Sequence, residues 1–226
     1  MTESKNGFPA DLELYYWPTA NGIKISVLLE ELGLAYTTRL INIRDGEQHT
    51  PAFTAISPSG RIPAIVDHAP TAVAPVALFE SAAILLYLAE KADRFLGTPP
   101  QRHTLNQWLF WQAAHVPSAL GRLHHLLEKA PQRVDWLLER ARADATRVYA
   151  TLEARLGQHD YLLGSDVSIL DFAVFPWIQP ARQGFELPHY PLIAQWRERL
   201  KDRPALQAAY AKGRAWTPQE RSLVIQ

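Results

Sequence analysis

The order of short β-prone runs and helical stretches near the N-terminus is the feature that most restricts the fold. A strand is expected at Leu12–Tyr16, where Pro18 follows. Asn21-Gly22 then opens a helix whose apolar residues recur at spacings of three and four before Gly33 ends it. A second strand is expected over residues 36–43. The sequence therefore predicts a β-α-β unit, in which a helix connects two parallel strands.

A second set of elements follows a polar connector. Residues 44–51 are polar and predict a loop or an irregular helix. Two short strands are expected over residues 61–66 and 76–79, and a helix over residues 82–91. The complete order, βαβ-α-ββα, predicts an α/β domain with a mixed sheet over residues 11–93.

The remainder of the chain has a different pattern. Gly97-Thr98-Pro99-Pro100 is typical of a linker. Apolar residues then recur at helical spacing without strand signals of comparable quality, which predicts an all-α domain over residues 101–213 and a tail over residues 214–226. The expected helices cover residues 102–129, 135–157, 169–182, 191–201 and 204–213.

Composition excludes several classes of function. Lys+Arg and Asp+Glu both number 23, and this balance argues against a nucleic-acid-binding protein. The chain has no cysteine, which excludes disulfides, thiolate metal sites and a catalytic thiol of the protein's own. Neither a secretory signal nor a membrane span is recognisable, so we expect a cytoplasmic protein without membrane partners.

Two short segments carry candidate ligand-binding groups at the start of predicted elements. Thr19 and Asn21 place a hydroxyl and an amide at a helix N-terminus, an arrangement that favours an anion such as a thiolate. Both are also ordinary capping residues. Pro63 lies where a strand should begin, and a cis bond there would present the backbone of Ile62 to a ligand. A proline at a strand edge is the alternative.

Glu80-Ser81 forms a third such segment, between the last strand and its helix. Glu80 can hold an α-amino group, while the hydroxyl and backbone N–H of Ser81 can hold an α-carboxylate. The alternative is that Ser81 is simply the N-cap of the helix.

Taken together, these segments resemble the glutathione-transferase superfamily over residues 11–212. Gly164–Asp171 is similar to that family's N-capping box, in which Ser168 and Asp171 cap each other. The resemblance implies a thioredoxin-like N-terminal domain, an all-helical C-terminal domain, glutathione as co-substrate and a homodimer. Phe79 would lie near the dimer interface.

Longer segments are similar to the bacterial Nu class, relatives of the yeast prion-forming nitrogen regulator. These segments are residues 18–24, 46–49, 57–67 and 105–112. Family members reduce disulfides with glutathione and lack an essential protein cysteine. Ala20 departs from the pattern, because proline is expected there in close relatives.

The resemblance also implies roles for individual residues. Thr19 would hydrogen-bond the glutathione sulfur with support from Asn21, and no metal is expected. His115, His124 and His125 are read as lining or surface residues. The expected glutathione contacts are Gln48 and Arg61 at the glycyl carboxylate, Ile62 and Pro63 at the cysteinyl unit, and Glu80 and Ser81 at the γ-glutamyl unit. Arg140 is a further expected contact, and the alternative for it is an arginine on the solvated face of a helix.

Three functions follow from this interpretation. The first is reduction of a small-molecule disulfide by the thiolate of bound glutathione. The second is conjugation of glutathione to a small electrophile, and the third is glutathione binding without catalysis.

Overall fold

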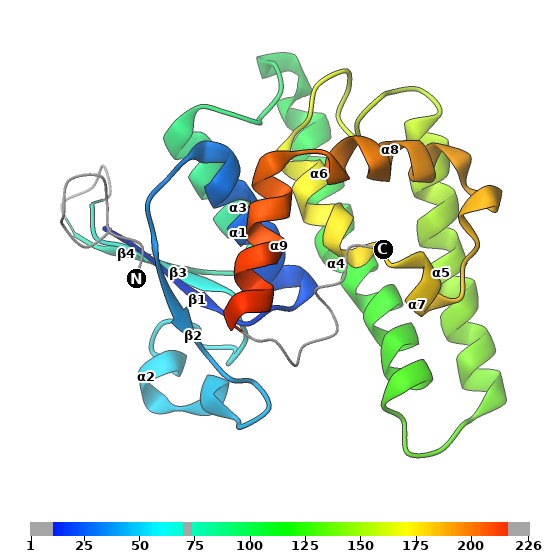
Figure 1. The fold of residues 1–226 in the computed structure, drawn as a ribbon, viewed down its shortest axis with the longest axis horizontal. Helices are drawn as coiled ribbons and strands as arrows, with labels where there is room; N and C mark the ends of the chain where they lie inside the picture. The colour runs from blue at the N-terminus through cyan, green and yellow to red at the C-terminus, as the bar shows by residue number, and fades with distance from the viewer. Residues whose placement is uncertain (1–10, 70–73, 217–226) are drawn as a thin grey trace. The chain divides into compact units, whose positions relative to one another are not determined.

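The computed structural model describes residues 11–69 and 74–216, and its contacts divide the chain into two compact units (Figure 1). Within the described ranges, the first unit contains the residues up to Arg94 together with α9 (Pro204–Trp216). The second unit contains Phe95–Arg203. This division differs from the boundary expected at residue 213, because α9 packs against α1 (Ala20–Leu32) of the first unit.

The first unit contains a mixed sheet, as the sequence predicts. Its described strands are β1 (Leu12–Tyr16), β2 (Thr37–Leu40), β3 (Ala64–Asp67) and β4 (Val76–Phe79), in the spatial order β2-β1-β3-β4. β1 is parallel to β2 and antiparallel to β3, which is antiparallel to β4. The predicted α/β fold class of this unit is confirmed.

β2 is shorter than the strand expected over residues 36–43. It ends at Leu40 because Asn42 begins a turn. The Asn42 side chain accepts from Arg44 N at 3.0 Å and donates to Asp45 at 2.6 Å. The connector then forms a 3₁₀ turn, Glu47–His49, and the short helix α2 (Pro51–Thr54).

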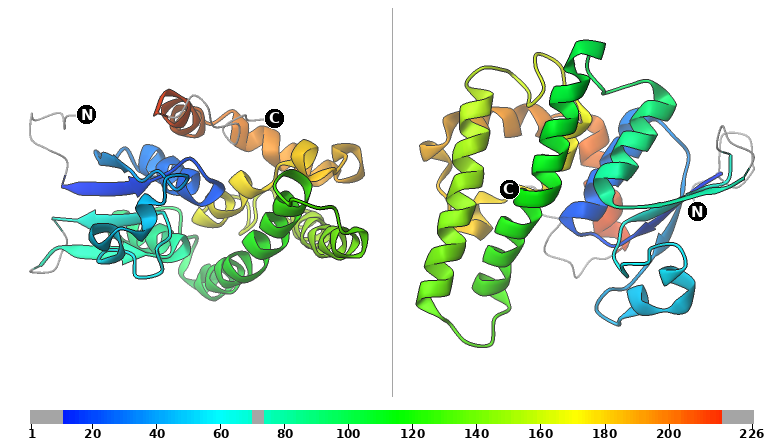
Figure 2. Two further views of the ribbon diagram at one scale, coloured as in Figure 1. Left: turned by 90° about the horizontal axis from the view of Figure 1, so that it is seen from below. Right: turned by 180° about the vertical axis from the view of Figure 1, so that it is seen from behind.

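Helix α1 is buried along most of its length. All eight residues from Gly22 to Leu29 are buried, although the sequence indicates only one apolar stripe. α1 packs against α3 (Ser81–Ala92) and against α9, and Figure 2 shows α9 running beside it. Lys212 of α9 pairs with Glu30 of α1, and its ammonium lies 5.1 Å from the centre of the Tyr36 ring. These contacts make α1 the centre of the first unit.

The second unit is helical throughout its described residues. Its two long helices, α4 (Arg102–Glu128) and α5 (Asp135–Leu156), pack side by side (Figure 2). α8 (Pro191–Lys201) has the expected bounds. The single helix expected over residues 169–182 is wrong: α6 (Ile169–Val174), a 3₁₀ turn (Phe175–Trp177) and α7 (Pro180–Gln183) replace it. Pro176 and Pro180 cannot donate the backbone hydrogen bonds of a continuous helix.

The predicted capping box at the start of α6 is confirmed. Asp171 is fully buried and accepts from Ser168 N at 2.9 Å and from Ser168 Oγ at 3.0 Å. It also accepts from Leu162 N at 2.9 Å and from Trp196 Nε1 at 2.8 Å. One carboxylate therefore connects the helix start, the preceding loop and α8.

In residues 11–69 and 74–216, no helix combines the length and apolar character needed to cross a bilayer.

We expect Asp171→Ala to lower the free energy of unfolding by about 3–5 kcal/mol, because it removes the acceptor of four buried donors. Ser168→Ala removes one capping group and should cost about 1 kcal/mol. Urea denaturation of both variants measures the difference. Equal effects would show that the network beyond the cap contributes nothing.

Candidate functional site

Three connections of the first unit meet at one end of its sheet. Ala64 pairs with Tyr15 on one side and with Phe79 on the other. The residues just outside these pairs therefore lie at the same edge. They are Pro63 before β3 and Glu80 after β4, and the connection from β1 to α1 leaves the sheet at this end too. The register thus brings together three of the segments that the sequence singles out.

Thr19 is the N-cap of α1. Its backbone is extended, with φ −99° and ψ 166°, and its Oγ1 accepts a hydrogen bond from Gly22 N at 3.2 Å. A Cβ on Gly22 would lie 2.1 Å from the Trp17 carbonyl oxygen, so only glycine fits here. The capping interpretation is confirmed, but it leaves the hydroxyl proton available, because a hydroxyl accepts and donates at once. Asn21 lies in the first turn of α1, half-buried like Thr19.

The peptide bond between Ile62 and Pro63 is cis, which settles the isomer that the sequence left open. Pro63 is buried, and the paired residues of β3 begin only at Ala64. Ile62 therefore lies outside the sheet ladder, at the edge shared with Glu80.

The structure contradicts the alternative in which Ser81 is the N-cap of its helix. The N-cap of α3 is Glu80 and not Ser81, which is the first helical residue. Glu80 has φ 67° and ψ 107°, and its side chain does not cap the helix. Such a backbone costs a non-glycine residue on the order of 1–3 kcal/mol and is concentrated at functional sites. Among the described residues, the Ser81 hydroxyl has no hydrogen-bond partner.

Gln48 and Arg61 lie on two neighbouring loops. A Cβ on Gly60 would lie 3.1 Å from the Gln48 carbonyl oxygen and 3.1 Å from His49 Nδ1. Ser57 Oγ donates to the Arg61 carbonyl oxygen at 2.8 Å and so holds that loop. The Gln48 amide nitrogen is 3.1 Å from His49 Nε2, and the Arg61 side chain is exposed. An amide and a guanidinium are therefore available to an anionic ligand.

Lys24 is a residue of this region to which sequence reasoning assigned no role. Only 1% of its surface is exposed, although lysine is almost never fully buried. Burial lowers the pKa of Lys24 to about 7, and the Glu80 carboxylate opposes that shift. A signal was present in the sequence, because Lys24 lies one turn before Leu28 and so on the same side of the helix as that member of the apolar stripe.

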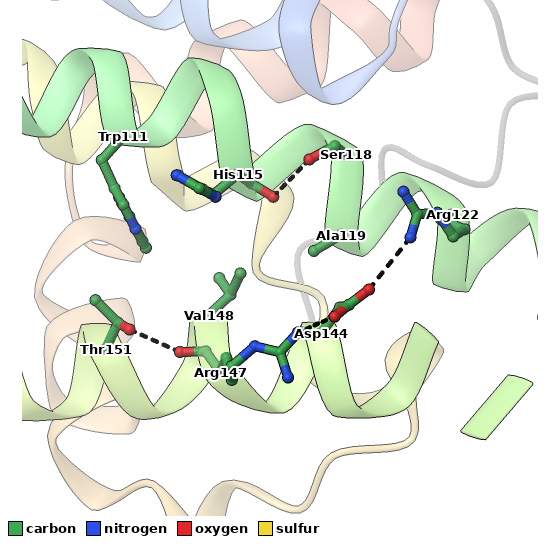
Figure 3. Close-up of a pocket in the computed structure, with 9 residues that line it drawn as sticks. All are labelled: Trp111, His115, Ser118, Ala119, Arg122, Asp144, Arg147, Val148 and Thr151. Atoms are coloured by element: carbon green, nitrogen blue, oxygen red, sulfur yellow. Dashed lines mark hydrogen bonds and ion pairs between the residues drawn. The ribbon is translucent and has the colours of Figure 1, made fainter. Parts of the chain in front are cut away.

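Arg140 lies on α5 of the second unit, where its Nε is 3.7 Å from Asp144 Oδ1. Asp144 also pairs with Arg122 at 3.2 Å and with Arg147. Figure 3 shows Asp144, Arg122 and Arg147 in a cavity of about 400 Å³ between α4 and α5, and Arg140 is not among the residues that line it. The cavity is lined by Trp111, His115, Ser118, Ala119, Arg122, Asp144, Arg147, Val148 and Thr151. Two arginines and one aspartate line the cavity, which gives it a net positive charge, and His115 is among the lining residues.

Within the described ranges, no group of three or more His, Cys, Asp or Glu side chains could hold a metal ion. Burial, reinforced by the charge of Arg182, lowers the pKa of His124 to about 4. This histidine is therefore neutral at physiological pH.

Two family models match the chain. The model of the glutathione S-transferase N-terminal domain matches residues 21–91, and that of the C-terminal domain matches residues 135–212. The chain is 42% identical over 204 residues to the disulfide-bond oxidoreductase YfcG of Escherichia coli (strain K12), an alignment that covers 89% of this chain and 95% of YfcG.

Solved structures of glutathione transferases have the same fold. One from Burkholderia graminis holds two glutathione molecules per subunit; it is 31% identical, with a TM-score of 0.84 and coverage of 88% of this chain and 87% of that one. Another from Pseudomonas putida holds one glutathione disulfide per subunit; it is 31% identical, with a TM-score of 0.84 and coverage of 91% and 92%.

We expect Lys24→Met to be more stable than the wild type at pH 7, because it removes a buried charge. Lys24 titrates at about 7 in the native state and at 10.5 in the unfolded state. Between these values the unfolded state binds more protons, so wild-type stability rises with pH by up to about 1.4 kcal/mol per unit.

The advantage of Lys24→Met should therefore shrink from pH 7 to pH 10 in urea denaturation. Lys129→Met, at an exposed position, is the control and should show no such trend. A constant difference between Lys24→Met and the wild type would contradict the prediction.

Proposed function

Because the chain belongs to the glutathione S-transferase superfamily, we propose that it reduces small-molecule disulfides through the thiolate of bound glutathione. It is an enzyme of that superfamily with glutathione as co-substrate. The observation that carries the disulfide chemistry is Thr19, a hydroxyl donor at the N-terminus of α1 in a chain without cysteine. The reactive sulfur must then come from the ligand. The similarity to a disulfide-bond oxidoreductase at 42% identity supports the same choice.

We assign Thr19 to hold and ionise the sulfur. Its Oγ1 accepts from Gly22 N, and the hydroxyl can still donate its proton to a second partner. The thiolate is the nucleophilic form of a thiol, and donors at a helix N-terminus lower the thiol pKa. Asn21, in the same helical turn, is assigned to support this geometry.

The remaining groups fit the other parts of a γ-glutamyl-cysteinyl-glycine ligand. Ile62 next to cis-Pro63 would pair with the cysteinyl backbone. Glu80 would bind the α-ammonium, and Ser81, at the first turn of α3, would bind the α-carboxylate. Gln48 and Arg61 are assigned to the glycyl carboxylate.

The proposed reaction consumes two glutathione molecules per disulfide. The first thiolate attacks one sulfur of the substrate, so that a mixed disulfide forms and the other substrate sulfur leaves as a thiolate that takes up a proton. A second glutathione thiolate then attacks the glutathionyl sulfur of the mixed disulfide. The products are two substrate thiols and glutathione disulfide, so the substrate gains the two electrons that glutathione loses.

Two other functions use the same site. A transferase would direct the same thiolate to an electrophilic carbon, and a binding protein would hold glutathione without turnover. The presence of Thr19, Pro63, Glu80 and Ser81 at one end of the sheet speaks against a binding protein without catalysis. The similarity to a disulfide-bond oxidoreductase and the absence of cysteine place the disulfide reaction before conjugation.

We also propose that the chain is a homodimer in the cytoplasm. β4 is an edge strand, and its Phe79 is 39% exposed, which is unusual for a phenylalanine. A second copy could cover this side chain. A reaction that consumes reduced glutathione fits the reducing conditions of the cytoplasm.

Turnover of bis(2-hydroxyethyl) disulfide with glutathione tests the reaction class. We expect rates well above the uncatalysed exchange and weak activity toward an aryl halide. Rates equal to the background with the disulfide, together with aryl halide conjugation, would assign the chain to conjugation. Binding of glutathione without turnover in either assay would assign it to the binding proteins.

Variants of Thr19 separate the donor role from the capping role. Thr19→Ala should lower kcat/KM by about 10- to 100-fold, because a hydrogen bond to a charged group contributes about 1.5–3 kcal/mol. Thr19→Ser keeps both roles and should retain most activity. Thr19→Asp caps α1 but repels a thiolate, so it should fold stably and be inactive. Activity in Thr19→Asp would show that this residue only caps the helix.

A further inference from the structure

We propose that Lys24 is a positioning residue of the glutathione site: its buried ammonium holds the Glu80 carboxylate and balances the charges that meet at the γ-glutamyl end. This inference rests on the proposed binding site of the preceding section. It adds a residue that makes no contact with the ligand and acts through Glu80.

The position of Lys24 is the first observation. Lys24 lies in the second turn of α1, directly after the turn that carries Thr19 and Asn21. Only 1% of its surface is exposed, so a ligand cannot reach its ammonium. α1 packs against α3, and the N-cap of α3 is Glu80. Both helices begin at the same end of the sheet, so Lys24 lies on a turn of α1 near the start of α3.

The conformation of Glu80 is the second observation. Its φ of 67° lies in the region that favours glycine, and its side chain is not used to cap α3. An unfavourable backbone persists only where the surroundings hold it in place. Glu80 is exposed, so its carboxylate can meet a ligand while the buried ammonium of Lys24 attracts it from within the domain. This electrostatic attraction, between residues whose helices begin at the same end of the sheet, is the basis for assigning Lys24 to hold the carboxylate.

The charge balance at this end of the site gives the reason for a buried cation. A bound γ-glutamyl group brings an α-ammonium and an α-carboxylate next to Glu80. With Glu80 alone the three groups sum to one negative charge, and with Lys24 they sum to zero. An unbalanced charge away from bulk water is costly. A lysine that costs stability in the free protein therefore lowers the cost of binding the ligand.

Glutathione binding by calorimetry tests this role without relying on turnover. We expect Lys24→Met to raise the Kd by about 3- to 30-fold, the range for directly coupled charged groups. In the Glu80→Gln background the same substitution should change the Kd by less than about twofold, because its target is gone. Lys24→Arg keeps the charge and should restore part of the affinity.

Two controls locate the effect. Ser26→Ala removes another fully buried polar side chain of α1, one that contacts Tyr36 Oη at 3.3 Å, and it should leave the Kd unchanged. Glutaryl-cysteinyl-glycine lacks the α-amino group and so places two carboxylates together without a ligand cation; Lys24→Met should weaken its binding at least as much as that of glutathione.

The outcomes separate the inference from the proposed function. Wild-type binding with an unchanged Kd in Lys24→Met overturns the role of Lys24 alone, and so does an equal loss in the wild-type and Glu80→Gln backgrounds. Binding without disulfide turnover overturns the proposed reaction and leaves Lys24 in its role. Lys24→Gln is the second charge-removing variant; failure of both to fold would make Lys24 a purely structural residue and overturn the proposal.

Discussion

The close approach of Gly22 to the turn after β1 is the constraint on which the first unit depends. A side chain at this position would overlap the Trp17 carbonyl oxygen, so the first turn of α1 can lie directly against that turn only with glycine there. Thr19 then caps the helix and directs its N-terminus to the end of the sheet. Because the next seven residues of α1 are also buried, the helix cannot shift without opening the core. The position of the anion-binding end is therefore fixed by packing.

The chain places polar groups around that end and no thiol of its own. A protein thiol would need its own resolving partner and would be open to oxidation. In the proposed reaction the sulfur of glutathione avoids both requirements, because each oxidised ligand would leave the site and a reduced one would replace it. The fold must then supply groups that position and ionise the sulfur of the ligand. Thr19 and the N-terminus of α1 would face the sulfur, and Glu80 would face the γ-glutamyl end of the ligand. The role proposed for Lys24 extends this set of charges into the core, where its side chain is buried despite the cost of burying a cation.

Local signals made the fold largely predictable, and long-range contacts account for what was missed. β1 and β4 have the expected bounds, and the capping box of α6 follows from two residues three positions apart. The break between α6 and α7 has a local signal, because Pro176 and Pro180 are apparent in the sequence. The single helix expected over residues 169–182 does not take them into account. The burial of Lys24 and the attachment of α9 to α1 depend on which elements meet in space, and periodicity along one helix does not contain that information. The placement of Thr19, Pro63 and Glu80 at strand ends and helix starts could be predicted because these are local features. Their ligand-binding roles follow from the family resemblance and stay predictions.

The docking of α9 on α1 has a consequence for how the chain is made. The first unit is built from two stretches of sequence, and the whole second unit, Phe95–Arg203, is inserted between them. During synthesis the sheet and α1 leave the ribosome long before α9 does. The apolar side of α1 that α9 covers is therefore exposed until the helical unit has been synthesised. The last helix thus completes the first unit. A chain that stopped at Arg203 would lose part of the core of that unit, and not a dispensable terminal segment.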